Sequence, residues 1–556
     1  MRFEPFLLLQ LLSGYALASI CFLFGIPLGA WQLWVSLAVA SSAAAFCSRR
    51  ALVWTLALNL LAFVLTLYTF TYVHIDASIC HLPMAHFMQD GWNPVRESSI
   101  DAVRSCFAAR GLDDVELFSV LHIIASPKFS QILAAQMQSA TGLFTALGYP
   151  IWIMCFILGA AAFRFAQSVW GMSRWMSAAF GVLVASNYII AENSFFGLVD
   201  YVTYSSIVVS ALSVGMWSKT KSPVDLFMFF GGAVMAVSSK FNSLACIALL
   251  LLYASVIGRG DRRMRIAFLF FFLSLAVFCI IPYWTSAWLH GSPFYPAHSF
   301  RSDVPLMDLT EDFIGNGDAD KMGYVARMVY AWISRPLAEW GCALWYSQDT
   351  FAPCWRYGFL TSGENPFFCV MFWSGALGSL FINRNRITVL GWMLTAAFLA
   401  LPVKYIGYSR YVCYVFFIAA LFWYNMFAAC SGRARKYLFL IPAAFSVCLG
   451  GYCVKMFFRQ IRGEGICQKN IGRIAESREY GFSEKKSHWA YVLRQRLALE
   501  GASVSSEGKR ELEIAWPFVL VGEDLCGRDE SVWWSDGDRF PRPVRDSGSV
   551  MKGDFE

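Results

Sequence analysis

Apolar runs close to 20 residues long recur along this chain, and they constrain its fold more than any other feature. A helix of about 20 residues crosses the roughly 30 Å hydrocarbon core of a bilayer. Only 15% of the 556 residues are charged, whereas soluble proteins usually carry about 25%. The runs therefore predict an all-α, polytopic membrane protein that lies in a lipid bilayer.

Thirteen of these runs are candidate transmembrane helices. The first could be a signal peptide, but Glu4 offsets the charge of Arg2, so we expect a retained helix. The short runs 224–237 and 244–257 are also candidates for half-helices that turn inside the protein. The full set covers residues 6–24, 31–46, 51–72, 142–165, 176–190, 201–217, 224–237, 244–257, 266–283, 367–382, 387–401, 411–427 and 437–454.

Lysine and arginine residues indicate which side of the membrane each short loop faces, because they concentrate on the cytoplasmic side. With the N-terminus inside, the short outer loops hold only Lys240, Lys404 and Arg410. We therefore expect a protein of the cell inner (plasma) membrane with a cytoplasmic N-terminus and an external C-terminus. The short inner segments hold the other sixteen: Arg2, Arg49, Arg50, Arg164, Arg174, Lys219, Lys221, Arg259, Arg262, Arg263, Arg265, Arg384, Arg386, Arg433, Arg435 and Lys436.

Three long polar segments fall on the external face: 73–141, 284–366 and the tail 455–556. The transmembrane module thus covers 1–454, and the tail, with a predicted helix at 487–499 and a strand-like run at 514–521, is long enough for a small domain. Within the first segment, the run 115–140 begins with helical apolar spacing, and Pro127 is expected to break it. This helical run is expected either to lie in the membrane interface or to pack on the bundle.

Six cysteines fall in these external segments, two in each. An even set suits an oxidising compartment, so disulfide pairing within each segment is a hypothesis. The six are Cys80, Cys106, Cys342, Cys354, Cys467 and Cys526.

The stretch 71–94, TYVHIDASICHLPMAHFMQDGWNP, directly follows the third apolar run. Asp76 lies about one turn past the end of that run, where a carboxylate is costly unless it has a partner or a task. A polar start to an ordinary loop is the alternative interpretation for a lone aspartate. The presence of His81, Pro83 and the Gly-Trp-Asn-Pro sequence at 91–94 favours a functional site.

The pattern D-A-x-x-x-H-L-P at 76–83, with G-x-x-P at 91–94, resembles the first external loop of type-C integral-membrane glycosyltransferases (GT-C fold). These enzymes are similar to the superfamily of protein mannosyltransferases and aminoarabinose transferases. The resemblance implies an enzyme that takes a sugar from a polyprenyl-phosphate donor on the external face, with Asp76 as the catalytic carboxylate. Many members place a second acid beside the first, whereas here the neighbours are Ile75 and Ala77.

Two further patterns resemble the same family. G-S-P-F-Y-P at 291–296 follows a predicted helix, which makes Trp288 and Tyr295 candidate substrate-loop residues. Arg410 with Tyr411 resembles the R-Y motif whose arginine contacts the donor phosphate. From the residues alone, an aromatic and proline-rich loop is usually a membrane anchor, and Arg410 could equally extend to lipid headgroups.

Transfer from such a donor needs a base for the acceptor hydroxyl and cations for the leaving phosphate. Asp200 resembles the acid of the second external loop in this family, and we prefer it to Glu192 as a second catalytic carboxylate. Lys240 and His81 join Arg410 as candidate donor-phosphate ligands. Contact with lipid headgroups is the alternative for Lys240, and local hydrogen bonding is the alternative for His81.

No zinc-ligand spacing, P-loop or dinucleotide glycine pattern occurs in the sequence, so no metal ligand is assigned. The cofactor stays unknown, with a divalent cation as an open alternative, and no nucleic-acid partner is expected. The acceptor is expected to be a glycan, a lipid or a protein. A flippase or transporter of lipid-linked saccharides is the alternative function, although transporters usually show matched halves. An O-antigen polymerase or ligase is a further alternative, expected to rely more on external arginines.

Overall fold

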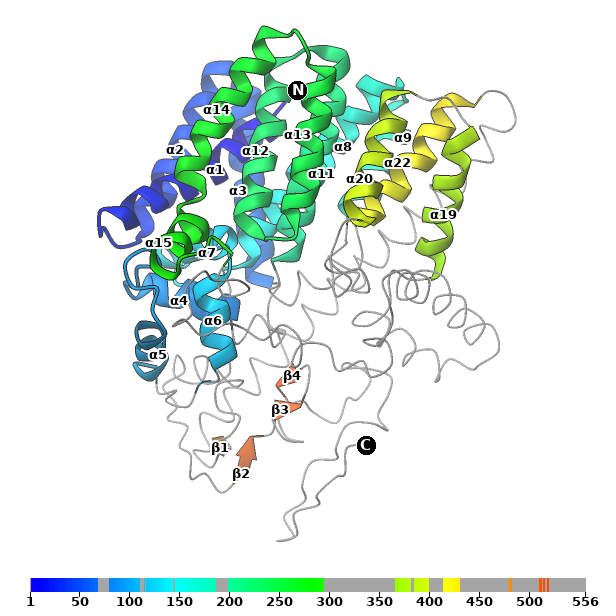
Figure 1. Ribbon diagram of the computed structural model, residues 1–556. Coiled ribbons are helices and arrows are strands. Elements are labelled where there is room, and N and C mark those ends of the chain that lie inside the picture. Colours follow the sequence, from blue (N-terminus) through cyan, green and yellow to red (C-terminus); the bar gives the residue numbers. More distant parts are fainter. Residues whose placement is uncertain are drawn as a thin grey trace, which may run out of the picture.

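The computed structural model describes residues 2–68, 80–110, 115, 117–143, 146–186, 199–294, 366–381, 385–399 and 414–430, and four short strands between 480 and 519. In these ranges, long helices stand side by side, with shorter helices at the end away from the N-terminus (Figure 1). The long helices are α1 (Glu4–Leu23), α2 (Ala30–Cys47), α3 (Arg49–Tyr68), α8 (Gly148–Trp170), α9 (Arg174–Ala185), α11 (Asp200–Thr220), α12 (Pro223–Ser239), α13 (Ser243–Ile257), α14 (Arg262–Phe278), α19 (Pro366–Phe381), α20 (Arg386–Leu399) and α22 (Tyr414–Ala429).

Four described helices, α1, α2, α3 and α8, are long and apolar enough to cross a membrane. A fifth span is formed if α14 and the segment Ile280–His290 count as one bent unit. Helices α9, α12, α13, α20 and α22 are apolar but shorter. A helical protein with several apolar helices that suit a bilayer is thus confirmed, while the number of thirteen spans stays a prediction.

Two predicted span boundaries are wrong. Helix α8 begins at Gly148 rather than at 142, because Gly142 ends the preceding helix in a left-handed conformation with a φ of 72°. The run 266–283 is not one straight helix, since α14 ends at Phe278 and the chain then bends by 64°. The runs predicted as candidate half-helices form α12 and α13, each of which is continuous.

The segment predicted to be the first external one forms a small helical module, which we call the α4–α7 module. It consists of α4 (Leu82–Gln89), α5 (Ile100–Ala108), α6 (Leu117–Ala125) and α7 (Phe129–Thr141). The predicted break at Pro127 is confirmed, because α6 and α7 are separated there. Residues 129–138 of α7 are all buried, and α7 packs on α1, α2 and α8, so the bundle-packed alternative is right for this helix.

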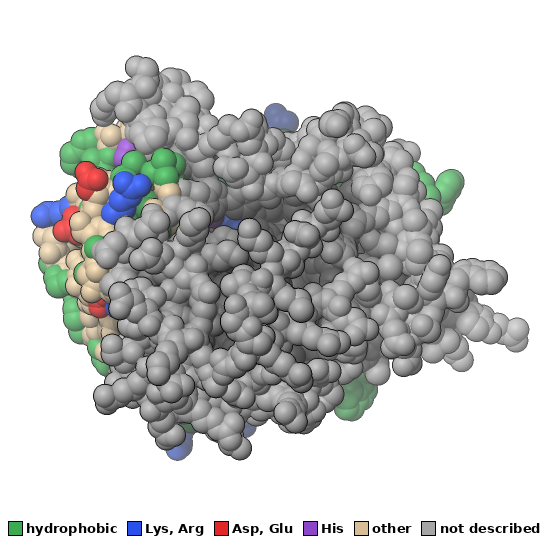
Figure 2. Space-filling view, turned by 90° about the horizontal axis from the view of Figure 1, so that it is seen from below, with side chains coloured by type: hydrophobic (Ala, Val, Ile, Leu, Met, Phe, Trp, Pro, Cys, Tyr) green, Lys and Arg blue, Asp and Glu red, His purple; other side chains and the backbone are tan. Residues whose placement is uncertain are grey.

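The exposed surface of the α4–α7 module carries acidic and basic side chains close to one another (Figure 2). Mixed charge is typical of a surface that faces water, whereas side chains on α2 and α3 such as Trp34, Val53 and Leu60 are exposed and apolar. The exposed charged residues of the module are Asp90, Arg96, Glu97, Asp101 and Arg104. The two surfaces therefore suit water and lipid, respectively.

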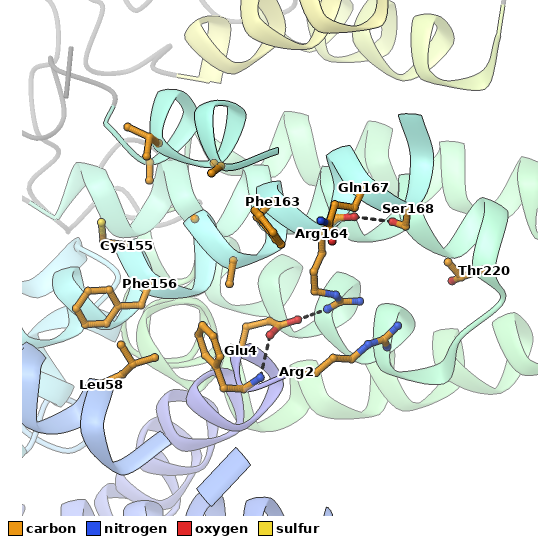
Figure 3. Close-up of a pocket in the computed structure, with 17 residues that line it drawn as sticks. Arg2, Glu4, Leu58, Cys155, Phe156, Phe163, Arg164, Gln167, Ser168 and Thr220 are labelled. Atoms are coloured by element: carbon orange, nitrogen blue, oxygen red, sulfur yellow. Dashed lines mark hydrogen bonds and ion pairs between the residues drawn. The ribbon is translucent and has the colours of Figure 1, made fainter. Parts of the chain in front are cut away.

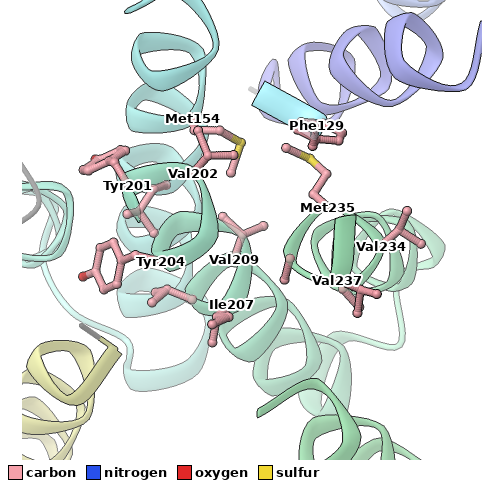
Figure 4. Packing of buried hydrophobic residues seen from close by; sticks show 14 of the residues in the cluster. Phe129, Met154, Tyr201, Val202, Tyr204, Ile207, Val209, Val234, Met235 and Val237 are labelled. Carbon is pink, nitrogen blue, oxygen red and sulfur yellow. The ribbon is translucent and has the colours of Figure 1, made fainter. Parts of the chain in front are cut away.

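The core lies where α7, α8, α11 and α12 meet. Phe129, Met154 and Met235 converge there from three of these helices (Figure 4). Helices α11 and α12 approach closely because Gly232 has no side chain: a Cβ at this position would lie 2.9 Å from the Ser206 carbonyl oxygen. Small residues commonly permit such approach between membrane helices.

Within the strand-like run predicted at 514–521, the described residues form two short strands. Strand β3 (Ile514–Ala515) pairs antiparallel with β4 (Phe518–Val519). Strand β1 (Tyr480–Phe482) pairs in parallel with β2 (Arg510–Leu512). The helix predicted at 487–499 lies outside the described residues, as does the last predicted span.

Candidate functional site

Asp200 and Lys240 form an ion pair at the end of the bundle that also carries the α4–α7 module. Asp200 begins α11, and Lys240 is the C-terminal cap of the antiparallel neighbour α12, so the two residues reach the same end. The Lys240 ammonium donates a hydrogen bond to Asp200 Oδ1. The Asp200 side chain is 3% exposed and that of Lys240 is 22% exposed. Two residues predicted separately from sequence therefore lie in contact, and the lysine reaches solvent.

The turn that follows Lys240 is stabilised by hydrogen bonds of the Ser243 hydroxyl and by ring contacts of Phe241. The Ser243 hydroxyl lies 2.7 Å from the Lys240 carbonyl oxygen and 2.8 Å from that of Ala236. The Phe241 ring packs edge-on against Phe294, with the ring centroids 6.3 Å apart, and against Tyr283 at 5.2 Å. The turn at 291–294, which its proline and aromatic residues predict from sequence, thus contacts Phe241, the residue that directly follows Lys240.

Trp288 does not point into this contact. It lies on α15 (Thr285–His290), which follows the kinked segment η2 (Ile280–Trp284), and its side chain is 80% exposed. Gly291 ends α15 with a φ of 73°, a conformation that glycine adopts readily. An exposed tryptophan at this end of a membrane protein suits either a lipid interface or a bound sugar.

His81 is buried at the start of α4 and is held by the neighbouring helices of the module. The Gln131 side-chain nitrogen lies 2.9 Å from His81 Nδ1, and the His122 ring is edge-on at 6.1 Å. This contact orients the His81 ring. It agrees with the alternative of local hydrogen bonding for His81, although the partner is a side chain and not the backbone.

The Gly-Trp-Asn-Pro sequence at 91–94 attaches the module to the bundle. The Asn93 amide donates to the Phe22 carbonyl oxygen at 2.8 Å, and Arg96 donates to that of Leu23 at 2.7 Å. Both acceptors belong to the last turn of α1, whose final carbonyls lack partners within the helix. This motif therefore has a clear structural task in the protein.

Lys128 is a buried charged residue that the sequence pattern does not reveal. It is fully buried between α6 and α7, where its amine donates to the carbonyl oxygens of Ile124 at 3.0 Å and Ser126 at 2.9 Å and faces the Trp92 ring at 5.8 Å. Burial lowers the pKa of the Lys128 amine from 10.5 to about 7. Nothing in the local sequence marks this lysine, because a charged residue after a helix break normally faces water.

Replacing Lys128 by methionine is expected to stabilise the protein below pH 7 and to lose that advantage as the pH rises toward 10.5. The folded-state pKa lies below the unfolded value, so folding releases a proton in this window and stability increases with pH. The pKa shift sets an upper limit of about 5 kcal/mol on the cost of burying the charged amine at low pH. Methionine removes this cost, but it leaves two carbonyl oxygens without a donor, which offsets the gain by about 1–3 kcal/mol. Melting midpoints of both proteins at pH 6 and pH 10 measure the difference.

Lys219→Met is the matched control for Lys128→Met, because Lys219 is exposed at the other end of the bundle. Its change in melting midpoint is expected to be small and equal at both pH values. An equal midpoint change at pH 6 and pH 10 for Lys128→Met would contradict the buried-amine interpretation.

The disulfide hypothesised between Cys80 and Cys106 is wrong. Cys106 is a free, half-buried thiol on α5, and no disulfide joins it to Cys80 at the start of α4. Burial, with the nearby Glu97 and Asp90 carboxylates, raises the pKa of the Cys106 thiol to about 11. An even number of cysteines in a segment does not by itself bring two thiols close enough to form a disulfide. The other two hypothesised pairs lie outside the described residues.

A second group of charges lies at the N-terminal end of the bundle. Arg164 of α8 donates to Glu4 of α1 and, at 2.9 Å, to Asp225 of α12. Arg2 lies 3.6 Å from Asp225, and both carboxylate side chains are almost completely buried. Charge patterning predicts Arg164 only as a loop cation, although it is an ionisable residue inside an apolar helix, which is itself a signal for a site.

Asp76, Tyr295 and Arg410 lie outside the described residues, as do Glu192 and Lys404. Within the part of the chain that is described, no three His, Cys, Asp or Glu side chains gather as metal ligands. Comparison with protein-family profiles, with curated proteins and with solved structures finds no match to this chain.

Proposed function

We propose that this chain is a membrane glycosyltransferase that moves a sugar from a polyprenyl-phosphate donor to an acceptor on the side of the membrane opposite its N-terminus. The observation that supports the proposal best is the Asp200–Lys240 ion pair, which lies beside the turn at 291–294 and at the same end as the α4–α7 module. A partly exposed ammonium at the edge of an apolar bundle suits a phosphate on a lipid whose chain remains in the membrane.

In the proposed reaction, the acceptor hydroxyl attacks the anomeric carbon of the sugar. The bond from that carbon to the phosphate oxygen breaks, and polyprenyl phosphate leaves with the bonding electrons. Asp76 takes the acceptor proton, while Lys240 and Arg410 stabilise the leaving phosphate. Asp200 accepts a hydrogen bond from the Lys240 ammonium. We therefore assign Asp200 the role of positioning Lys240, in preference to a direct contact with the acceptor.

The decisive experiment offers polyprenyl-phosphate sugars to the full-length protein purified in detergent and monitors released polyprenyl phosphate. Turnover is expected with a lipid-linked donor and not with a nucleotide sugar, because a donor on the external side must be carried by lipid. Absence of turnover with every lipid-linked donor, together with saccharide transport in liposomes, would overturn the proposal in favour of a flippase.

Lys240→Met is expected to raise the KM for the lipid donor by about tenfold to a hundredfold, since a charge-assisted hydrogen bond contributes about 1.5–3 kcal/mol. Lys240→Arg is expected to retain much of the affinity because the charge is kept. Asp200→Asn is expected to have a smaller effect on the same KM, and its effect should nearly vanish in the Lys240→Met background because the two residues act together. Fully additive effects in this double-mutant cycle would contradict a positioning role.

A further inference from the structure

A cavity of about 780 Å³ lies at the N-terminal end of the bundle, between α1, α3, α8 and α9 (Figure 3). Its walls are apolar over most of their extent, with Leu58, Phe156 and Val182 among the lining residues. At one end lie Arg2, Arg164 and Gln167, whose side chains carry N–H donors, together with the hydroxyls of Ser168 and Thr220, which donate to protein acceptors. An apolar cavity of this size with a few polar groups at one end is typical of a ligand site.

The two guanidinium groups keep donors for a ligand. Arg164 uses one terminal nitrogen on Glu4 and the other on Asp225, and Arg2 donates to the Ser222 hydroxyl at 3.0 Å. A guanidinium has five N–H groups. Among the described residues, no protein acceptor takes the remaining N–H groups of Arg2 and Arg164. The side-chain amide of Gln167 also lacks a protein partner in these ranges.

The buried carboxylates of Glu4 and Asp225 balance the charge of the two arginines and hold them in place. The group therefore carries no excess positive charge, and it recognises an anion through directed hydrogen bonds. Phosphate oxygens are the acceptors that the planar guanidinium group fits best, often through two parallel hydrogen bonds. A phosphate at this end would face Arg2, whose side chain is 38% exposed.

The apolar part of the cavity has the dimensions of a lipid chain. The apolar lining residues on α8 extend from Cys155 to Phe163, eight steps that span about 12 Å at a rise of 1.5 Å per residue. That distance is most of the roughly 15 Å thickness of one hydrocarbon leaflet. The cavity opens to the outside of the bundle beside Val182, a lining residue that is 46% exposed.

We propose that this cavity binds one phospholipid from the leaflet at the N-terminal end of the bundle. The phosphate accepts hydrogen bonds from Arg2, Arg164 and Gln167, and one acyl chain lies along α8. The site is separate from the proposed catalytic site, since Thr220 lines the cavity at the opposite end of α11 from Asp200, about 30 Å away along the helix. The inference does not depend on the proposed glycosyltransferase activity.

The test is native mass spectrometry of the full-length protein in detergent, titrated with dioleoyl phosphatidylglycerol and, separately, with dioleoylglycerol, which has the same chains and no phosphate. We expect one phosphatidylglycerol molecule to be retained with at least about tenfold higher affinity than dioleoylglycerol, the effect of one charge-assisted hydrogen bond. Arg2→Gln is expected to bring the two affinities within about threefold of each other. Equal binding of both lipids by the unmodified protein would overturn the proposal.

Val182→Trp is expected to abolish the retained lipid by filling the cavity, whereas Val39→Trp should leave it unchanged. Val39 is the matched control because it is 42% exposed on α2 and does not line the cavity. Retention of the lipid by Val182→Trp, in a protein whose melting midpoint is unchanged, would overturn the proposed location. Displacement by millimolar inorganic phosphate, or preferential displacement by polyprenyl phosphate, would assign the site to that ligand and reject the phospholipid.

Discussion

Arg164→Met is expected to destabilise the protein by about 3–5 kcal/mol, the cost of removing one partner from a buried ion pair. The substitution preserves a long apolar stem but leaves Glu4 without the guanidinium and leaves Asp225 with only the more distant Arg2 and the Thr220 hydroxyl. Both carboxylate side chains are almost completely buried, so water solvates them poorly once Arg164 is removed. The measurement is the melting midpoint of the purified protein in detergent, with loss of the monodisperse species on heating as the readout.

The control and the rescue separate charge from packing. Arg174→Met removes an exposed arginine from α9 and is expected to change stability by less than about 0.5 kcal/mol. Adding Glu4→Gln and Asp225→Asn to Arg164→Met removes the unpaired charges and should recover a large part of the loss, because neutral replacement of a buried ionic group is often tolerated. A triple variant no more stable than Arg164→Met alone would show that the loss comes from packing.

Asp76→Asn is expected to reduce sugar transfer by about 10²–10⁴-fold, the usual contribution of a general base. The amide has almost the same volume as the carboxylate but cannot accept the acceptor proton, so expression and melting midpoint should be retained. Initial rates of polyprenyl phosphate release with saturating donor and acceptor measure the effect. A loss of less than about tenfold would contradict the role of Asp76 as the base.

Asp101→Asn is the matched control for Asp76→Asn, because Asp101 is an exposed carboxylate in the same external segment, in the first turn of α5. Its activity is expected to equal that of the unmodified protein. The comparison with Asp200→Asn is also informative, since Asp200 is assigned to positioning Lys240 and should be the milder change. A larger loss in Asp200→Asn than in Asp76→Asn would reverse the two roles.

Sequence periodicity predicted the helices well where local rules decide the outcome. The apolar runs at 6–24 and 31–46 match α1 and α2 within a few residues, and Pro127 separates α6 from α7 as a proline should. Periodicity failed where the backbone changes direction without a change in composition. The run 266–283 is apolar throughout, yet the chain bends after Phe278, so an apolar run alone overestimates the length of a helix.

The candidate site shows the same division. Charge counting singled out Lys240 because it lies in a short outer loop, and a family resemblance singled out Asp200, but no sequence rule joined the two. Their contact depends on the close approach of α11 and α12 at Gly232 and on the turn between these helices. The Gly-Trp-Asn-Pro sequence was interpreted as part of a site, whereas its asparagine binds the end of α1.

The sequence by itself determined that this chain forms apolar helices long enough for a bilayer, because helix length and hydrophobicity are local properties of consecutive residues. Only the tertiary structure decided which charged residues are paired and which are buried. Lys128 and Arg164 look like ordinary polar interruptions in the sequence, yet one is enclosed by α6, α7 and Trp92 and the other connects α1, α8 and α12. These environments come from helices far apart along the chain, and the packing of such helices is not encoded in any local pattern.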